Sequence, residues 1–296
     1  MSRRPVSDLP ASIRQRLLNR AHETNRPFNE LLQYFAMERF LYRLSESPHA
    51  AMFVLKGALM FTTLTTLRSR PTMDIDLLGR FSNSIDGVVD VMRDVCLQNV
   101  EPDGMDFDPN SIVGERIAEA ADYEGVRVRL HGALGTAQIS IRLDVGFGDV
   151  VFPSACATDY PSLLDSPSPR LNCYSKESAI AEKFHIMVRL GTLNSRMKDY
   201  FDIWFLSRQF EFDGQTLATA IKRTFENRRT EIPPRPTALS VGFSEDSAKQ
   251  TQWRAFIRKN RLEDTTGDLR QVVFAIAAFL GPLADALAEG RSPPGT

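Results

Sequence analysis

The stretch that most constrains this chain is residues 70–78, where two aspartates stand two positions apart among apolar residues. Side chains alternate between the faces of a strand, so Asp74 and Asp76 would share one face while Ile75 and Leu77 are buried on the other. Two carboxylates on one strand offer the hard oxygen ligands that Mg2+ prefers. They also repel each other unless a cation or a proton intervenes. A lone Asp-x-Asp is more often an acidic turn or a strand edge, so its meaning depends on the rest of the chain.

Composition excludes several classes of protein. The 296 residues are 43% hydrophobic and 25% charged, as in an ordinary globular protein, and the net charge of -1 gives no global attraction to nucleic acid or membranes. Cys96, Cys156 and Cys173 form no CxxC pair, which argues against a zinc site or a disulfide framework and fits a reducing cytoplasm. The N-terminus has no apolar signal segment. Residues 272–287 are the most apolar run, but Pro282 and Asp285 interrupt it, so we expect no membrane span.

A turn of small residues precedes the aspartate strand. The apolar residues from Met52 lead into Lys56, Gly57 and Ala58, and helical character then continues to about residue 67. Such a turn at the start of a helix lets backbone N–H groups approach a phosphate closely, and Lys56 would add a positive charge. The alternative is an ordinary strand-to-helix turn. The turn gains interest because only one helix separates it from Asp74.

A third carboxylate follows in a predicted antiparallel hairpin. Residues 125–131 and 138–145 both alternate between apolar and polar, with a turn at 132–135. Within the second strand Ile141 and Leu143 belong to the buried face, whereas Arg142 and Asp144 belong to the polar face. Asp144 would therefore stand on a strand near Asp74 and Asp76, unless it is merely a strand-end residue next to Gly146.

The remaining pattern predicts an α+β fold in two domains. Residues 1–160 would hold N-terminal helices and a mixed or antiparallel sheet flanked by helices, and residues 161–296 would form a helical C-terminal domain. We interpret the proline- and serine-rich segment 149–170 as the linker, and residues 101–109 as a loop. Further helices are predicted by their apolar periodicity. They cover residues 8–24, 29–44, 84–99, 176–190, 196–206, 216–229, 246–259 and 268–287.

One of these helices is too apolar for its charges to be incidental. Asp199 and Asp202 lie three residues apart and share a face, and Lys198 stands four residues before Asp202, so the two can pair. A salt bridge on a solvated face is the simplest explanation. Yet Tyr200, Phe201, Ile203, Trp204 and Phe205 surround these charges, and a buried helix needs partners or a ligand for them.

Three aspartates on neighbouring strands, a phosphate-binding turn and cations from a later helical region fit phosphoryl or nucleotidyl transfer. Four ordered motifs carry a more specific resemblance. They are Val54-Leu-Lys-Gly-Ala58, Arg70-x-Thr72-x-Asp74-Ile-Asp76-Leu77, Ala181-Glu-Lys183 and Arg196-x-Lys198-Asp199-x-x-Asp202. With these motifs the chain resembles the AbiEii-type nucleotidyltransferases, toxin components of toxin–antitoxin systems, over roughly residues 30–210.

The resemblance implies a minimal nucleotidyltransferase core like that of DNA polymerase beta, one or two Mg2+ ions and an NTP substrate. It also implies nucleotide transfer to the 3′ end of tRNA, as in some members, and a neighbouring antitoxin that is commonly a transcriptional repressor. Asp74, Asp76 and Asp144 would hold the metal, and Lys183 would contact the NTP phosphates.

Further residues take roles from the same resemblance. Lys198, Asp199 and Asp202 would belong to a nucleotide-binding or catalytic helix, and Arg70 would contact a phosphate or brace the aspartate strand. The turn departs from the usual Gly-Ser pattern, because Ala58 has no hydroxyl. Thr62 or Thr72 could supply one instead, and the role of Lys56 stays unsettled.

Two other functions compete with transfer to RNA. An NTP-binding regulatory or interaction protein without turnover would explain Ala58, but intact Asp74, Asp76, Asp144 and Lys183 argue against it. Transfer of a nucleotide to a protein side chain would change only the acceptor. The basic segment 222–229 mildly favours RNA, although charges at a helix end are usually just solvated.

Overall fold

The computed structural model describes residues 8–64, 70–117, 125–263 and 267–292. Two compact units account for them, and each is described by itself. Unit 1 comprises residues 1–67, 72–148 and 156–173, and unit 2 comprises residues 68–71, 149–155 and 174–296. The chain therefore passes between units at several points, whereas the sequence suggested a single change near residue 160. The reason is that the proline-rich segment is not a plain linker, since two of its strands belong to the sheet of unit 1.

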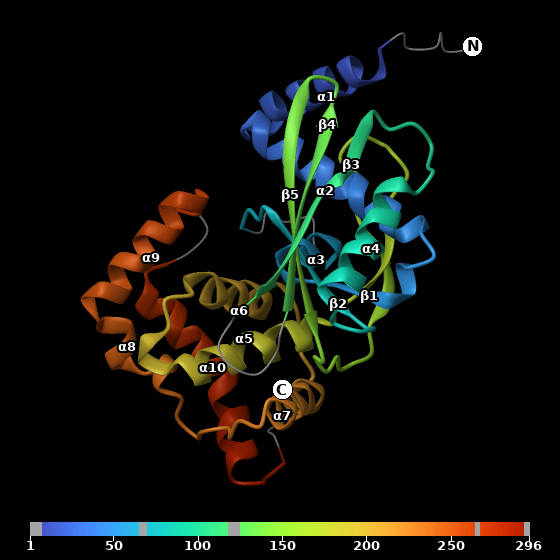
Figure 1. Cartoon of the computed structure of the whole chain (residues 1–296). Helices are drawn as coiled ribbons and strands as arrows, with labels where there is room; N and C mark the ends of the chain where they lie inside the picture. Colours follow the sequence, from blue (N-terminus) through green and yellow to red (C-terminus); the bar gives the residue numbers. More distant parts are fainter. Residues whose placement is uncertain (1–7, 65–69, 118–124, 264–266, 293–296) are drawn as a thin grey trace. The chain divides into compact units, whose positions relative to one another are not determined.

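Unit 1 is built on a seven-stranded mixed sheet in the order β3-β4-β5-β2-β1-β7-β6 (Figure 1). The strands are β1 (Phe53–Lys56), β2 (Asp74–Gly79), β3 (Met105–Ile117), β4 (Gly125–Leu134), β5 (Ala137–Phe147), β6 (Cys156–Asp159) and β7 (Arg170–Cys173). β4 and β5 form the predicted antiparallel hairpin, and β2 pairs in parallel with β5 and antiparallel with β1. This order places the aspartate strand beside the strand that carries Asp144.

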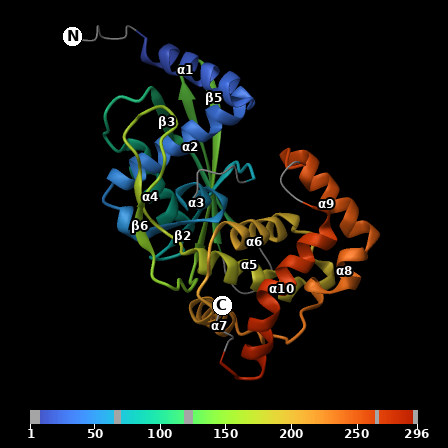
Figure 2. The same cartoon turned by 180° about the vertical axis from the view of Figure 1, so that it is seen from behind.

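The alternation read from the sequence sets which face of the sheet is buried. Ile75, Leu77, Ile141 and Leu143 are at most 1% exposed, and helices α2 and α4 pack against the sheet (Figures 1 and 2). Burying a side chain of this size contributes roughly 1.5–3 kcal/mol, so a slip of one residue in register would be costly. The helices of unit 1 are α1 (Leu9–Thr24), α2 (Phe28–Glu46), α3 (Gly57–Leu64) and α4 (Ile85–Leu97). The predicted end of α3 near residue 67 lies outside the described residues.

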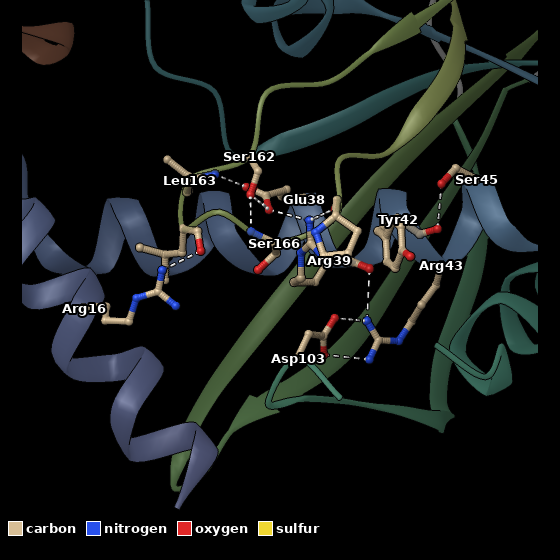
Figure 3. Close-up of polar contacts among 12 residues, drawn as sticks. Arg16, Glu38, Arg39, Tyr42, Arg43, Ser45, Asp103, Ser162, Leu163 and Ser166 are labelled. Carbon is tan, nitrogen blue, oxygen red and sulfur yellow. Dashed lines mark hydrogen bonds and ion pairs between the residues drawn. The ribbon is translucent and has the colours of Figure 1, made fainter. Parts of the chain in front are cut away.

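Buried ion pairs fix α2 against neighbouring loops. Arg43 donates to both carboxylate oxygens of Asp103 at 2.7 and 3.0 Å, and both side chains are less than 10% exposed (Figure 3). One turn earlier, Glu38 accepts hydrogen bonds from the Leu163 backbone N–H and the Ser162 hydroxyl. These charges are satisfied rather than exposed, so we assign them to the architecture of unit 1.

Unit 2 is helical, as predicted for this half of the chain. Its described helices are α5 (Lys176–Leu190), α6 (Met197–Gln209), α7 (Gly214–Asn227), α8 (Val241–Glu245), α9 (Ser247–Asn260) and α10 (Leu269–Ala288). Ser175 caps α5 by accepting a hydrogen bond from the Ser178 N–H, as its position before the apolar run suggested. α5 packs against α7 and α6, and α6 against α10 (Figure 1).

One expectation about the secondary structure was wrong. Residues 101–109 are not all loop, because β3 begins at Met105. Met105 and Phe107 are buried while Asp106 and Asp108 are exposed, which is the alternation of a half-buried strand. The predicted last helix, residues 268–287, is confirmed and includes Pro282. α10 runs through it for 20 residues with a mean hydropathy of 1.8, long and apolar enough to cross a membrane. This is weak evidence for a span, since core helices share that composition and α10 packs within unit 2.

Candidate active site

Charged side chains form a row across five strands on one face of the unit 1 sheet. Asp76 on β2 is the register partner of Lys56 on β1 and of Asp144 on β5. Register partners on neighbouring strands leave the same face of a sheet. The row continues through Arg127 on β4 to Glu115 on β3. The predicted position of Asp144 beside the aspartate strand is therefore confirmed.

The signs along this row alternate with one exception. Lys56 and Asp76 are opposite in charge, as are Asp144 and Arg127, but Asp76 and Asp144 are both carboxylates and directly adjacent. Like charges on paired strands destabilise a sheet. A second row runs one step along the strands, where Asp74 is the partner of Arg142, and Arg142 is the partner of Arg129. The row through Asp76 thus carries an excess of negative charge, and the row through Asp74 carries an excess of positive charge.

Arginines neutralise two of the three predicted site aspartates. Arg127 holds Asp144 side-on, with its Nε 2.8 Å from one carboxylate oxygen and its Nη2 2.7 Å from the other. These hydrogen bonds raise the pKa of the Arg127 guanidinium further above its usual range. Arg142 forms a short contact with a single oxygen of Asp74, and its side chain is 44% exposed. Arg142–Asp74 is the more open of the two pairs.

The carboxylates do not converge into a ready-made cage. Within the part of the chain that the structure describes, no three His, Cys, Asp or Glu side chains are grouped so that they could hold a metal ion. We had expected Asp74, Asp76 and Asp144 to lie within reach of one ion. Their backbone positions are adjacent, and Arg127 and Arg142 pair with two of the carboxylates. The donor set still fits Mg2+, because adjacent carboxylate oxygens are the ligands this ion takes.

The turn after β1 brings backbone directly against Asp76. Gly57 has φ of +70°, and a Cβ added there would stand 2.0 Å from Oδ2 of Asp76. The position therefore requires glycine both for its left-handed backbone and for this close approach. Ala58 follows as the second residue of α3 and is buried. Of the two hydroxyls considered as substitutes, Thr62 donates to the Leu59 carbonyl and Thr72 to the Asp74 carbonyl.

Unit 2 gathers the remaining predicted residues into a buried ion network. Lys183 on α5 lies 3.3 Å from Asp199 and 2.8 Å from Asp202, two carboxylates on one face of α6. Arg70 donates to both oxygens of Asp202, at 2.8 and 3.0 Å, and Arg196 donates to Asp199 at 2.7 Å. Arg70, Lys183 and Arg196 thus hold the two carboxylates of α6. Arg70 braces Asp202 rather than the aspartate strand.

In this network, pairing with opposite charges shifts the pKa values more than burial does. Burial opposes the charge on Asp202, but Arg70 and Lys183 lower the pKa of that carboxyl to about 2. Burial likewise opposes the charge on Asp199, and Lys183 and Arg196 outweigh it, so its pKa is also lowered. The pKa of Lys183 is raised, because Asp202 and Asp199 overcome the effect of burial. All three groups are therefore charged at neutral pH.

Lys198 does not take the part that its spacing suggested. The predicted pairing with Asp202 was wrong, since Asp202 is held by Arg70 and Lys183. Lys198 is exposed and makes no ion pair with any residue that the structure describes. Desolvation first, and then the positive charge of Arg196, lower its pKa. An exposed ammonium in a positive neighbourhood is suited to an anionic ligand.

Three residues of these clusters were not singled out as site residues from the sequence. Arg127 and Arg142 are partners of the aspartates in unit 1, and Arg196 is a partner of Asp199 in unit 2. A signal existed for Arg127, because β4 alternates and places it on one face with Arg129. The predicted convergence of Lys183 on Asp74 and Asp76 joins two separately described units, so it stays a prediction.

Comparison with known families decides the class of protein. Residues 39–278 match the family of nucleotidyl transferase AbiEii toxins of type IV toxin–antitoxin systems. The chain belongs to this family. It is accordingly a nucleotidyltransferase, and the family implies an NTP substrate and an antitoxin partner. Nucleotidyltransferases of this kind generally use a divalent metal. No curated protein sequence matched.

The chain also resembles solved structures. MenT4, a nucleotidyltransferase toxin from Mycobacterium tuberculosis H37Rv, is 18% identical with a TM-score of 0.50, over 96% of this chain and 99% of that one. A putative nucleotidyltransferase from H. pylori and JHP933 from Helicobacter pylori are each 15% identical with a TM-score of 0.45. Each match covers 88% of this chain. The first covers 96% of the solved chain and the second covers 93%. The likeness to MenT4 confirms the predicted α+β nucleotidyltransferase fold.

Proposed function

We propose that this AbiEii toxin transfers NMP from an NTP to an RNA acceptor, the 3′ end of tRNA, in a reaction that depends on Mg2+. The observation that carries the proposal is the register of Asp76 with Asp144, with Asp74 on the same face. Two adjacent carboxylates repel each other in the absence of a cation. In that row Lys56 and Arg127 flank the pair on its outer sides.

Asp74 and Asp76 would be the first ligands of the metal, and Asp144 would complete the set. When bound, a divalent cation bridges phosphate oxygens and offsets charge on the attacking and leaving oxygens. Gly57 sets the position of Asp76, because its backbone lies against that carboxylate. Arg127 fixes the orientation of Asp144 through two hydrogen bonds. The residues of this face would thus position charge rather than form covalent bonds to the substrate.

Unit 2 would supply the cations that a triphosphate needs. Lys183 is held between Asp199 and Asp202, and Arg70 and Arg196 add two further positive charges. A place where cations gather in this way attracts anionic ligands. Lys198 is exposed beside it and would contact a phosphate directly. The nucleotide-binding roles of these residues, and of Lys56, Gly57 and Ala58, come from the family resemblance.

The choice of RNA as the acceptor also rests on that resemblance. The basic segment 222–229 gives it little support, because three of its charged side chains have contacts within unit 2. Arg228 pairs with Asp149, the Arg223 guanidinium lies 4.3 Å from the centre of the Phe152 ring, and Lys222 lies 3.9 Å from Glu226. A cytoplasmic location, and an antitoxin that is a transcriptional repressor encoded nearby, are further parts of the proposal.

The test is transfer of label from each of the four α-32P-NTPs in the presence of Mg2+, with total RNA, purified tRNA or cell protein as the acceptor. We expect labelled tRNA with at least one NTP, and loss of label when the chelator EDTA is added or when the variant Asp76→Ala replaces the wild type. Labelled protein with unlabelled RNA would replace the proposed acceptor. Absence of label in every fraction, with a folded enzyme and Mg2+ present, would refute the proposed reaction.

A further inference from the structure

The two arginine–aspartate pairs of the sheet differ in a way that bears on how the site accepts its ligands. Arg127 contacts both oxygens of Asp144, and the two side chains are 26% and 23% exposed. Arg142 contacts one oxygen of Asp74, and its side chain is 44% exposed. A side-on pair with two hydrogen bonds is stronger than a single contact at the surface. Arg127–Asp144 is therefore a fixed brace, whereas Arg142–Asp74 can open.

If Arg142 left Asp74, no second carboxylate would stand beside it among its register partners. Its partner on β4 is Arg129, another cation, and Arg129 is already held by Glu115 at 2.6 Å. Arg142 and Arg129 would then be like charges on paired strands, which repel each other. An anion is the ligand that relieves this repulsion, and phosphate oxygens accept the hydrogen bonds of a guanidinium well.

The geometry points to an exchange of ion-pair partners by Arg142. A divalent cation binds Asp74, and Arg142 then leaves Asp74 and binds the polyphosphate of the substrate. This inference rests on the proposed function, since it requires a metal at the aspartates and an NTP. According to this inference, Arg142 and the metal compete for Asp74 before the substrate binds. The same arginine then binds the negative charge of the polyphosphate that the metal does not neutralise. No bond is made or broken except ion pairs and hydrogen bonds.

This exchange predicts changes of opposite sign in one variant. Arg142→Gln removes the competitor, so Mn2+ alone should bind roughly two- to fivefold tighter, as expected for loss of an exposed ion pair. The same variant removes a cation from the polyphosphate, so inorganic tripolyphosphate should bind about tenfold more weakly at saturating Mg2+. A residue that only supports the fold would weaken both equilibria or change neither.

The experiment is calorimetric titration of the full chain with Mn2+, and separately with tripolyphosphate in saturating Mg2+. Arg129→Gln is the matched control, because it removes an arginine from the same face but leaves Arg142–Asp74 in place. Its Mn2+ affinity should stay within about twofold of the wild type, the lower end of the effect of an exposed pair. Thermal unfolding confirms that each variant is folded, and Arg142→Met replaces Arg142→Gln if that variant is not, with changes in the same directions.

The outcomes separate the two proposals. Opposite changes in Arg142→Gln support the exchange. Unchanged or weaker Mn2+ binding in Arg142→Gln, or unchanged tripolyphosphate binding, overturns it while leaving the proposed function intact if wild type binds both ligands and Asp76→Ala does not bind Mn2+. A wild-type protein that binds neither Mn2+ nor tripolyphosphate would count against the proposed function itself.

Discussion

Asp76 and Asp144 are register partners on the adjacent parallel strands β2 and β5, so two carboxylates leave the same face of the sheet side by side. On the outer side of this pair, Arg127 holds Asp144 with two hydrogen bonds. Lys56 is the register partner of Asp76 on β1. Two carboxylates side by side repel each other, so a cation bound between them would stabilise unit 1.

Asp76→Asn removes one charge from this pair without changing its shape. We expect nucleotide transfer to fall by at least about a hundredfold, since even residues that only orient metal ligands are worth about 10- to 100-fold. The stabilisation by Mg2+, about 2.7 kcal/mol at a hundred times the Kd, should also disappear. Transfer assays and thermal unfolding with and without Mg2+ measure the two effects. Asp106→Asn, at an exposed position of β3, is the control and should keep both. Equal losses in the two variants would contradict the assignment.

Gly57→Ala tests the close approach of the turn to Asp76. The added Cβ would overlap the Asp76 carboxylate, and the left-handed backbone would cost roughly 1–2 kcal/mol in addition. We expect both lower stability and a loss of transfer activity. Gly135→Ala is the matched control, because Gly135 has a similar φ of +60° but its Cβ would meet only Pro10, at 3.3 Å. The control should show the backbone cost alone, so full activity in Gly57→Ala would refute the role of this turn.

The site on the sheet was largely predictable because alternation along a strand is a local property. The pattern around Asp74 and the pattern around Asp144 each fixed a face, and the parallel pairing of β2 with β5 joined them. The arginines were harder to anticipate, because pairing Arg127 with Asp144 requires the exact register of the hairpin. We had placed its turn at residues 132–135, whereas β4 continues to Leu134.

Composition was a poorer guide to structure than alternation where the two conflicted. Residues 101–109 contain aspartates, a glycine and prolines, yet Met105 and Phe107 bury one face of β3 against the core of unit 1. In unit 2 the helical spacing favoured a pair between Lys198 and Asp202. The partner of Asp202 is instead Arg70, 132 residues away along the chain, and no local pattern in one sequence reveals such a pair.

Two ion pairs of unit 1, one buried and one exposed, show how burial changes the contribution of an ion pair to stability. Arg43–Asp103 is buried and bidentate, whereas Arg93–Asp90 on α4 is exposed, with side chains 43% and 70% accessible. Asp103→Asn leaves a buried guanidinium without its full partner, so the free energy of unfolding should fall by about 3–5 kcal/mol. Asp90→Asn should cost less than about 1 kcal/mol. Urea denaturation measures both values, and similar losses in the two variants would contradict this account.

The network of unit 2 should make stability depend on pH through Asp202. Its pKa is lowered from 3.8 to about 2 in the folded protein, so the unfolded chain takes up the proton first as the pH falls. The contribution is fully present above about pH 4 and is lost between about pH 4 and pH 2. At roughly 1.4 kcal/mol per pKa unit it amounts to about 2 kcal/mol.

Asp202→Asn should therefore change two things. At pH 7 the variant removes the carboxylate that Arg70 and Lys183 share and leaves Lys183 with Asp199, which should cost about 3–5 kcal/mol of unfolding free energy. Between pH 4 and pH 2 the gap between wild type and variant should narrow by about 2 kcal/mol, because only the wild type loses the Asp202 contribution there. Denaturation of both proteins at a series of pH values measures this gap. A gap that stays constant below pH 4 would show that Asp202 does not carry the acid dependence.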